Sequence, residues 1–226
     1  MTLIRRPSPS FDDRSLPVSM LVLHYTGMET GEAAIARLAD PASKVSAHYV
    51  VEEDGTIIAM VDEAKRAWHA GLSHWRAITD VNSASIGIEI VNGGHDFGLP
   101  DFPDVQIAAV IALSRAIIAR HAITAQNVVG HSDIAPGRKI DPGEKFPWER
   151  LAREGVGAWP EVTAAMAPDE ARAAALLAAI GYNPALALPV TLTEFQRRYR
   201  PSRLDGVLDE ETMGLAEAVA GKATAA

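Results

Sequence analysis

The sequence has no cysteine among its 226 residues. Disulfide bonds and thiolate ligands are therefore excluded, so any bound metal must be held by His, Asp or Glu side chains. A chain without cysteine also agrees with a reducing cytosol. A run of 18 apolar residues is missing as well, and we expect no transmembrane segment.

Positive charge is scarce. The chain has 21 Lys and Arg against 29 Asp and Glu, a formal net charge of −8. This balance disfavours binding to nucleic-acid phosphates, and we predict no nucleic-acid partner. Arg5 and Arg6 are not followed by an apolar stretch long enough for a secretory signal. We therefore predict a cytoplasmic protein; if a leader has been removed, the alternative is the cell envelope.

Apolar residues make up 48% of the chain, which is enough for a proper core. Continuous apolar runs predict buried strands at residues 20–23, 86–91 and 128–129. Asp54-Gly55 between two further apolar runs predicts a hairpin of residues 48–51 and 56–61. Helices are expected at 31–39 and 148–154, and start signals at 101–104 predict a long helix whose inner stripe extends from Ile107 to His121. Residues 1–16, with Pro7 and Pro9, are interpreted as an extended arm.

The composition changes after a region without clear periodicity at 155–167, which we interpret as a linker. An Ala-rich helix at 168–180 is ended by Gly181. Thr191 and Glu194 form a capping-box pattern that predicts the start of the next helix. A third helix is expected at 209–219. We therefore predict two units, a main domain at 1–160 and a small three-helix domain at 168–222.

Candidate metal ligands lie at the ends of two predicted strands. His24 follows the first apolar run, His131 follows residues 128–129, and Asp141 comes ten positions after His131 in a loop rich in Pro and Gly. If the two strands are neighbours, the three side chains converge, and three ligands with an open fourth position are typical of catalytic zinc. The alternative interpretation is that each His is an ordinary polar residue at a strand end.

Two charged residues near these ligands could take part in chemistry. Lys139 is a cation beside Asp141, able to stabilise developing negative charge. Glu89 interrupts the apolar run IGIEIV. It is either a solvated residue on an outer face or a carboxylate in a cleft that accepts a proton from water.

An aromatic group follows in a region that resembles a loop. Trp68, His69 and Trp75 could belong to the core, but such side chains in a groove also suit the apolar faces of a sugar or peptide. We predict them, with Asn92 at the end of the strand containing Glu89, as substrate contacts.

Five segments follow one another along the chain: VLHYT around His24, VSAHYVVEEDG at 45–55, WHAG at 68–71, SIGIEIVN at 85–92 and GHSDIAPGRKIDPG at 130–143. Together they resemble the zinc-dependent N-acetylmuramoyl-L-alanine amidases of the type 2 amidase family, which is related to peptidoglycan recognition proteins and phage T7 lysozyme. The resemblance covers roughly residues 15–155. It implies an α/β fold with a mixed central sheet flanked by helices, and one zinc ion in a groove.

The resemblance also implies roles for individual residues. His24, His131 and Asp141 would be the zinc ligands, and Glu89 and Lys139 the catalytic residues. The T7-like branch has Cys in place of Asp141 and Tyr in place of Ala47. Since Ala cannot act as an acid or base, the match is to the bacterial branch that uses a Glu on the central strand.

The C-terminal segments LAAIGYNP at 177–184, EFQRRYRP at 194–201 and LDGVLDEETMGLAEAV at 204–219 resemble the small three-helix peptidoglycan-binding domain. The resemblance implies a glycan-binding role for this second unit.

These observations predict a zinc hydrolase that cleaves the amide bond between N-acetylmuramic acid and L-alanine. Its partner would be peptidoglycan or a soluble peptidoglycan fragment such as an anhydro-muropeptide. The alternative from another class is a sensor that binds muropeptides without cleaving them. The full ligand set together with Glu89 and Lys139 favours the enzyme. A zinc peptidase of the His-Glu-x-x-His class is disfavoured because that motif is missing.

Overall fold

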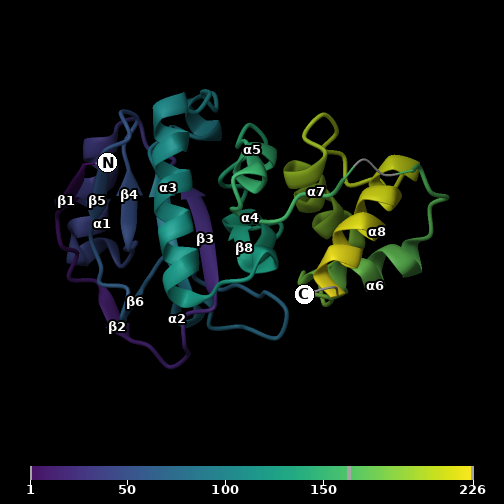
Figure 1. Cartoon of the computed structure of the whole chain (residues 1–226), viewed down its shortest axis with the longest axis horizontal. Helices are drawn as coiled ribbons and strands as arrows, with labels where there is room; N and C mark the ends of the chain where they lie inside the picture. The colour runs from purple at the N-terminus through teal and green to yellow at the C-terminus, as the bar shows by residue number, and fades with distance from the viewer. Residues whose placement is uncertain (1, 162–163, 225–226) are drawn as a thin grey trace.

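The computed structural model describes residues 2–161 and 164–224, arranged around a mixed six-stranded sheet (Figure 1). Its strands lie in the order β1 (Leu3–Arg5), β5 (Ile57–Ala59), β4 (Tyr49–Val51), β7 (Ser85–Ile90), β3 (Met20–Tyr25) and β8 (Val128–Gly130). Neighbours in the sheet are parallel except the β4–β5 hairpin. A separate antiparallel pair is formed by β2 (Phe11–Asp13) and β6 (Lys65–Ala67). The predicted strands and hairpin are therefore confirmed.

Helices surround this sheet. The described α-helices are α1 (Gly31–Ala39), α2 (Val81–Ala84), α3 (Asp104–His121), α4 (His131–Ile134), α5 (Trp148–Arg153), α6 (Glu170–Ile180), α7 (Leu188–Tyr199) and α8 (Glu210–Thr224). Short 3-10 turns occur at Pro41–Ser43, His95–Phe97 and Ala125–Asn127. The predicted fold class, a mixed sheet flanked by helices with a helical C-terminal region, is confirmed. None of the described helices is long and apolar enough to cross a bilayer.

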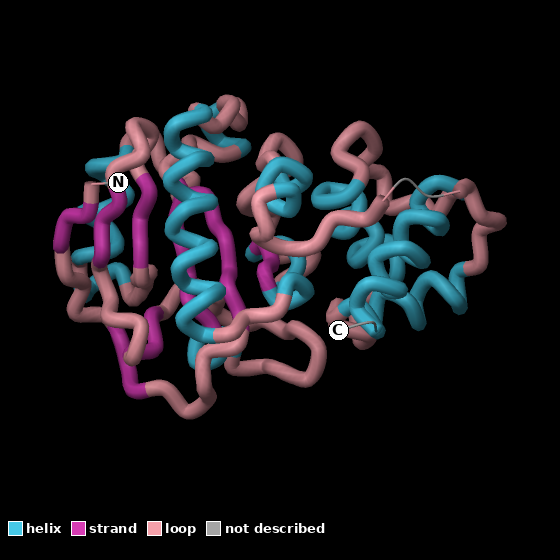
Figure 2. Tube along the Cα trace, in the orientation of Figure 1, coloured by secondary structure: helices cyan, strands magenta, loops and turns pink. Residues whose placement is uncertain are grey.

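The two faces of the sheet have different coverings. Alternate residues of a strand point to opposite faces. Leu21 and Leu23 of β3 share a cluster with apolar residues of α3, which crosses one face of the sheet in Figure 2. Met20 and Val22 of the same strand belong instead to a second cluster. The face that carries Val22 also carries His24 two residues on, so the candidate site lies on the side of the sheet opposite α3.

The C-terminal helices complete the second cluster. They lie together beyond β8, at the far end of the molecule from β1 (Figure 1). One continuous set of buried apolar side chains joins β3, β8 and α4 to α6, α7 and α8; it includes Val22, Val129, Ile134, Leu177, Phe195 and Val219. The predicted unit boundaries remain a prediction, since residues on both sides of the predicted linker share this cluster. Residues 162 and 163 of that linker lie outside the described part of the chain.

A buried ion pair ties α7 to the turn that follows β8. Nη1 of Arg198 lies 2.6 Å from Oδ2 of Asp133, and these side chains are only 4% and 1% exposed. The same carboxylate accepts hydrogen bonds from Tyr182 Oη at 2.7 Å and from the backbone N–H of Gly130 at 2.8 Å. The Arg198 guanidinium also lies over the ring of Trp148 at 4.0 Å. The C-terminal helices therefore hold the first turn of α4 in place.

Arg198→Met is expected to lower the free energy of unfolding by about 3–5 kcal/mol, because Asp133 would be left as a buried carboxylate without its cation. Met keeps most of the length and apolar volume of the side chain, so the loss reports mainly on the charge. Urea denaturation followed by circular dichroism measures the change.

Arg172→Met is the matched control, because Arg172 pairs with Glu217 on the surface of the same three helices. Exposed pairs contribute little to stability, so its denaturation midpoint should stay close to that of the parent. Equal losses for the two variants would contradict a special role for the buried pair.

Two features differ from the sequence predictions. The capping-box prediction at Thr191 is wrong: α7 begins at Leu188, with Ala187 as the N-cap and a Pro in the first turn, where proline is well tolerated. Glu194 pairs with Arg197 instead of capping. The N-terminal arm is extended as expected, but it also contributes β1 and β2. Its Pro residues lie between these two strands, where a missing N–H disrupts no ladder.

Candidate metal centre

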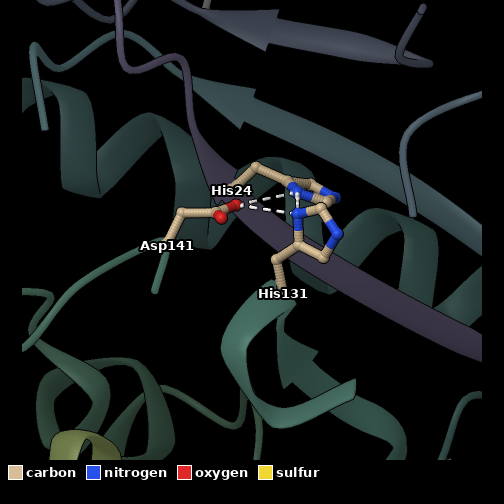
Figure 3. A group of neighbouring side chains, drawn as sticks. All are labelled: His24, His131 and Asp141. Atoms are coloured by element: carbon tan, nitrogen blue, oxygen red, sulfur yellow. Dashed lines mark hydrogen bonds and ion pairs between the residues drawn. The ribbon is translucent and has the colours of Figure 1, made fainter. Parts of the chain in front are cut away.

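Three side chains converge at the carboxyl ends of neighbouring strands (Figure 3). His24 lies near the end of β3, and His131 is the first residue of α4, directly after β8. Because β3 and β8 are adjacent and parallel, their carboxyl ends lie at the same edge of the sheet. Asp141 reaches the same point from the following loop, whose backbone carbonyl at this residue accepts a hydrogen bond from Ser132 N–H at 2.9 Å.

The atoms that converge suit a metal ion. The two Nδ1 atoms of His24 and His131 lie 3.0 Å apart, and Oδ2 of Asp141 lies 3.0 and 3.1 Å from them. Tetrahedral zinc with ligand bonds near 2.0–2.1 Å places its ligand atoms roughly 3.3 Å apart. Two imidazole nitrogens and one carboxylate oxygen form such a triangle here, so the residues fit a zinc ion.

The protonation states of this group also favour a cation. Burial, followed by the charge of His131, lowers the pKa of His24 to about 4, although the nearby Asp141 carboxylate acts in the opposite direction. Burial alone would raise the pKa of Asp141, but His131 and His24 hold it well below its usual range. At neutral pH His24 is therefore neutral and Asp141 ionised, the forms in which these side chains bind metal.

The ring of His131 is held from its far side. Its Nε2 lies 3.0 Å from the carbonyl oxygen of Ala70, to which it donates. The hydrogen of a neutral imidazole is then on Nε2, which leaves the Nδ1 lone pair directed at Asp141. Arg138 donates to the same carbonyl at 2.7 Å and to Leu72 O at 2.6 Å. The loop around Ala70 therefore forms one wall of the site.

Glu89 lies beside His24 on the neighbouring strand. In the β3–β7 pair the Cα of His24 is opposite that of Glu89, so the two side chains leave the same face of the sheet. Oε2 of Glu89 is buried and has no hydrogen-bond partner among the described residues. Burial raises its pKa well above the usual value; Asp141 raises it further, while Lys139 lowers it. A carboxyl group in this setting exchanges protons nearer neutral pH than an ordinary Glu.

The site opens onto a pocket of about 590 Å³. Among the predicted site residues, the pocket is lined by Trp68, His69, Glu89, His131, Lys139 and Asp141. The indole Nε1 of Trp68 donates to Asp12 at 2.7 Å, which fixes the ring at the side of the pocket. The structure therefore brings the predicted ligands, Glu89, Lys139 and Trp68 to one place.

Two predicted substrate contacts lie elsewhere. Trp75 is 2% exposed and packs edge-to-face on Tyr182, with ring centroids 5.3 Å apart, inside the cluster shared with the C-terminal helices. Asn92 is buried, where its side chain donates to Pro100 O and accepts from Gly94 N–H. Neither side chain lines the pocket described above. His69 lies against the buried side of His24, with its Nδ1 3.0 Å from Nε2 of that ligand.

The sequence analysis missed a polar chain that connects the pocket to α7. Tyr25 and His95, which line the pocket, are 3.0 Å apart through Oη and Nδ1. Nε2 of His95 lies 3.0 Å from Glu144, which pairs with Arg197 at 2.5 Å. The four residues are spread over 172 positions of sequence, and no local spacing connects them. The C-terminal helices therefore contact one side of the pocket through this polar chain, in addition to the first turn of α4.

A family model described as N-acetylmuramoyl-L-alanine amidase matches residues 14–144. The amidase AmiD of Escherichia coli (strain K12) is 38% identical over 232 residues, which cover 91% of this chain and 83% of that protein. The 1,6-anhydro-N-acetylmuramyl-L-alanine amidase AmpD of Salmonella typhimurium (strain SL1344) is 37% identical, over 65% of this chain and 87% of its own length.

Solved structures match over nearly the whole chain. AmiD from E. coli in complex with the substrate anhydro-N-acetylmuramic acid-L-Ala-D-gamma-Glu-L-Lys has a TM-score of 0.83 at 37% identity, covering 96% of this chain and 93% of that one. AmpDh3 from Pseudomonas aeruginosa in complex with anhydromuramic pentapeptide has a TM-score of 0.82 at 34% identity, with coverages of 96% and 95%.

Proposed function

The chain belongs to the N-acetylmuramoyl-L-alanine amidase family, and from this premise we propose that it works with one zinc ion held by His24, His131 and Asp141. The reaction is hydrolysis of the amide bond between the lactyl group of N-acetylmuramic acid and L-alanine. The observation that carries the metal assignment is the triangle of two Nδ1 atoms and one carboxylate oxygen, with sides of 3.0–3.1 Å. A zinc ion bound there would supply a Lewis acid and would lower the pKa of a coordinated water.

Glu89 is the proposed proton acceptor. Its Oε2 is buried without a hydrogen-bond partner among the described residues, on the face of the sheet that carries His24. The carboxylate takes a proton from water as the water oxygen bonds to the amide carbonyl carbon. It then returns that proton to the leaving nitrogen of L-alanine as the C–N bond breaks. One group thus serves as base and then as acid, and the protons balance.

Lys139 is the proposed electrostatic partner. It lines the same pocket and lies close enough to Glu89 to influence the pKa of that carboxyl group. During the attack, negative charge develops on the carbonyl oxygen of the substrate. An ammonium group beside the carbonyl oxygen stabilises that charge more than it stabilises the neutral amide.

Soluble anhydro-muropeptides are the proposed substrate class. Two relatives that match over nearly the whole chain were solved with anhydromuramic peptides bound. The AmpD relatives, which match about two thirds of the chain, are named as 1,6-anhydro-N-acetylmuramyl-L-alanine amidases. A pocket of about 590 Å³ is within the usual size range for sites that take small ligands.

Mass spectrometry of the products tests this function. The zinc-loaded protein is incubated with soluble 1,6-anhydro-muropeptide and, separately, with intact sacculi. The expected products are the free anhydro-sugar and a peptide that begins with L-alanine, released faster from the soluble fragment. Metal analysis should give one zinc per chain. Muropeptide that is retained by the protein but never cleaved would support the alternative, a binding sensor, and would overturn the proposal.

A further inference from the structure

The second nitrogen of His24 faces away from the candidate metal centre, toward His69. Nε2 of His24 lies 3.0 Å from Nδ1 of His69, and the two rings meet edge to face with centroids 5.1 Å apart. Nε2 of His69 lies 3.2 Å from Oγ of Ser85. The Ser85 hydroxyl in turn donates to the backbone oxygen of Val81 at 2.6 Å. These contacts form a single buried chain that ends on a fixed carbonyl.

The end of this chain determines every hydrogen in it. A carbonyl oxygen only accepts, so the one hydrogen of the Ser85 hydroxyl points at Val81. Ser85 Oγ must then accept from His69, which places the His69 hydrogen on Nε2. The Nδ1 of a neutral His69 is consequently an acceptor, and His24 donates to it from Nε2. The lone pair of His24 Nδ1 is left free and directed at Asp141.

We propose that Ser85 and His69 are positioning residues that lock His24 in the tautomer able to bind the metal. This inference rests on the proposed zinc site and adds to it the residues that prepare one ligand before the metal arrives. His24 would otherwise place a hydrogen on Nδ1, opposite the Nδ1 of His131. Outer hydrogen-bond partners of metal-binding His residues fix ring orientation in this manner, and their loss typically lowers metal affinity by about 10–100-fold.

The absence of a side chain at Gly87 leaves the space that the His69 ring occupies. A Cβ atom added at Gly87 would lie 2.5 Å from Cγ of His69, closer than any stable contact. The ring therefore lies directly on the backbone of β7, the strand between β3 and β4. Gly87 has an ordinary backbone conformation, so its small size, and not a special φ angle, is what the site uses.

The segment that carries His69 also serves the other His ligand. Oδ1 of Asn82 accepts from the backbone N–H groups of His69 and Ala70 at 3.0 and 2.7 Å. The carbonyl of Ala70 is the acceptor for Nε2 of His131. One short segment thus directs both imidazoles, through a side chain for His24 and through the backbone for His131. His69 also lines the pocket, so its predicted contact with substrate stays a prediction beside this positioning role.

Three variants test the proposal. Ser85→Ala removes the hydroxyl that accepts the hydrogen bond from His69. His69→Phe keeps a ring but removes both nitrogens, and Gly87→Ala adds a methyl group in the space that the His69 ring occupies. Each is expected to weaken zinc binding by about 10–100-fold in competition with a chromophoric chelator. In the metal-free protein, ¹⁵N NMR of the imidazoles should show His24 with its hydrogen on Nε2 in the parent and partly on Nδ1 in each variant.

Ser83→Ala is the matched control. Ser83 is as buried as Ser85, and its hydroxyl accepts from the backbone of Ser15 and Leu16, away from the metal centre. It should keep the zinc affinity and the His24 tautomer of the parent. Unchanged zinc affinity and tautomer in Ser85→Ala and His69→Phe would overturn the proposal. Because NMR reads the metal-free protein, it tests the positioning role even if the parent binds no zinc, an outcome that would instead overturn the proposed metal site.

Discussion

Glu89→Gln is expected to lower kcat by about 10²- to 10⁴-fold, the usual contribution of a general base, with little change in KM. Gln keeps the shape and nearly the volume of the side chain but cannot accept the proton. The zinc content should stay that of the parent, because the proposed ligands are His24, His131 and Asp141. Steady-state kinetics on anhydro-muropeptide, together with metal analysis of the same sample, measures both quantities.

Lys139→Met extends this test to the proposed electrostatic partner. It should also keep the zinc, while the rate falls by a factor on the order of 10²–10³ if the ammonium group stabilises the oxyanion. If Glu89→Gln turned over at a near-normal rate with its zinc in place, Glu89 would be only a structural carboxyl on β7. The proposed mechanism would then be wrong even though the family assignment stands.

His24→Ala is expected to abolish activity through a different route, the loss of the metal itself. The remaining ligands, His131 and Asp141, leave a zinc ion with two protein contacts, fewer than the three found in catalytic sites. Metal analysis after gel filtration should find almost no zinc, and the rate should fall to the uncatalysed background. Circular dichroism is expected to show an intact fold, because the central strands are buried by apolar side chains.

His74→Ala provides a comparison of the same chemical type. His74 lies in the loop after the Ala70 segment and does not line the pocket. This variant should keep both zinc and activity. Retention of stoichiometric zinc by His24→Ala would contradict the ligand assignment, and equal zinc loss in both variants would indicate general damage to the fold.

Much of the candidate site could be predicted from the sequence, because its residues lie at or near the ends of predicted strands. Residues 20–23 and 128–129 are continuous apolar runs, and such runs are typical of strands that are covered on both faces. A His near the end of each run and a carboxylate in the following loop predicted a shared site on the condition that the two strands are neighbours, and in the structure β3 and β8 are adjacent. The register that sets His24 opposite Glu89 could not be predicted, because pairing between strands far apart in sequence leaves no local pattern. That register is what distinguishes Glu89 from a solvated strand residue.

Other contacts could not be predicted from the sequence, because they depend on tertiary packing. Arg residues on helices are usually solvated, so the periodicity of α7 does not predict that Arg198 is buried. Trp75 and Trp68 lie in one loop-like region, yet one is in the core and the other lines the pocket. Local sequence reports that an aromatic residue is present, but not which surface covers it.

The C-terminal helices illustrate the same limit at a larger scale. Their composition and linker suggested an independent unit, and by that reasoning a chain ending near Ala158 would fold alone. The structure gives a physical reason to expect otherwise. Without α6–α8, the apolar face that includes Val22 and Val129 would be open to water, and Asp133 would lose its buried partner.

This arrangement has a consequence for protein synthesis. The ribosome makes the turn that carries His131 well before it makes α7, and 65 residues separate Asp133 from Arg198. At about 5–20 residues per second, that interval lasts roughly 3–13 s. For most of that interval the nascent chain contains every residue proposed for the chemistry, but the turn that carries one proposed metal ligand lacks its ion-pair partner. A chain released early by a premature stop codon would keep the Asp133 carboxylate without its cation, and we expect it to be less stable than the full chain.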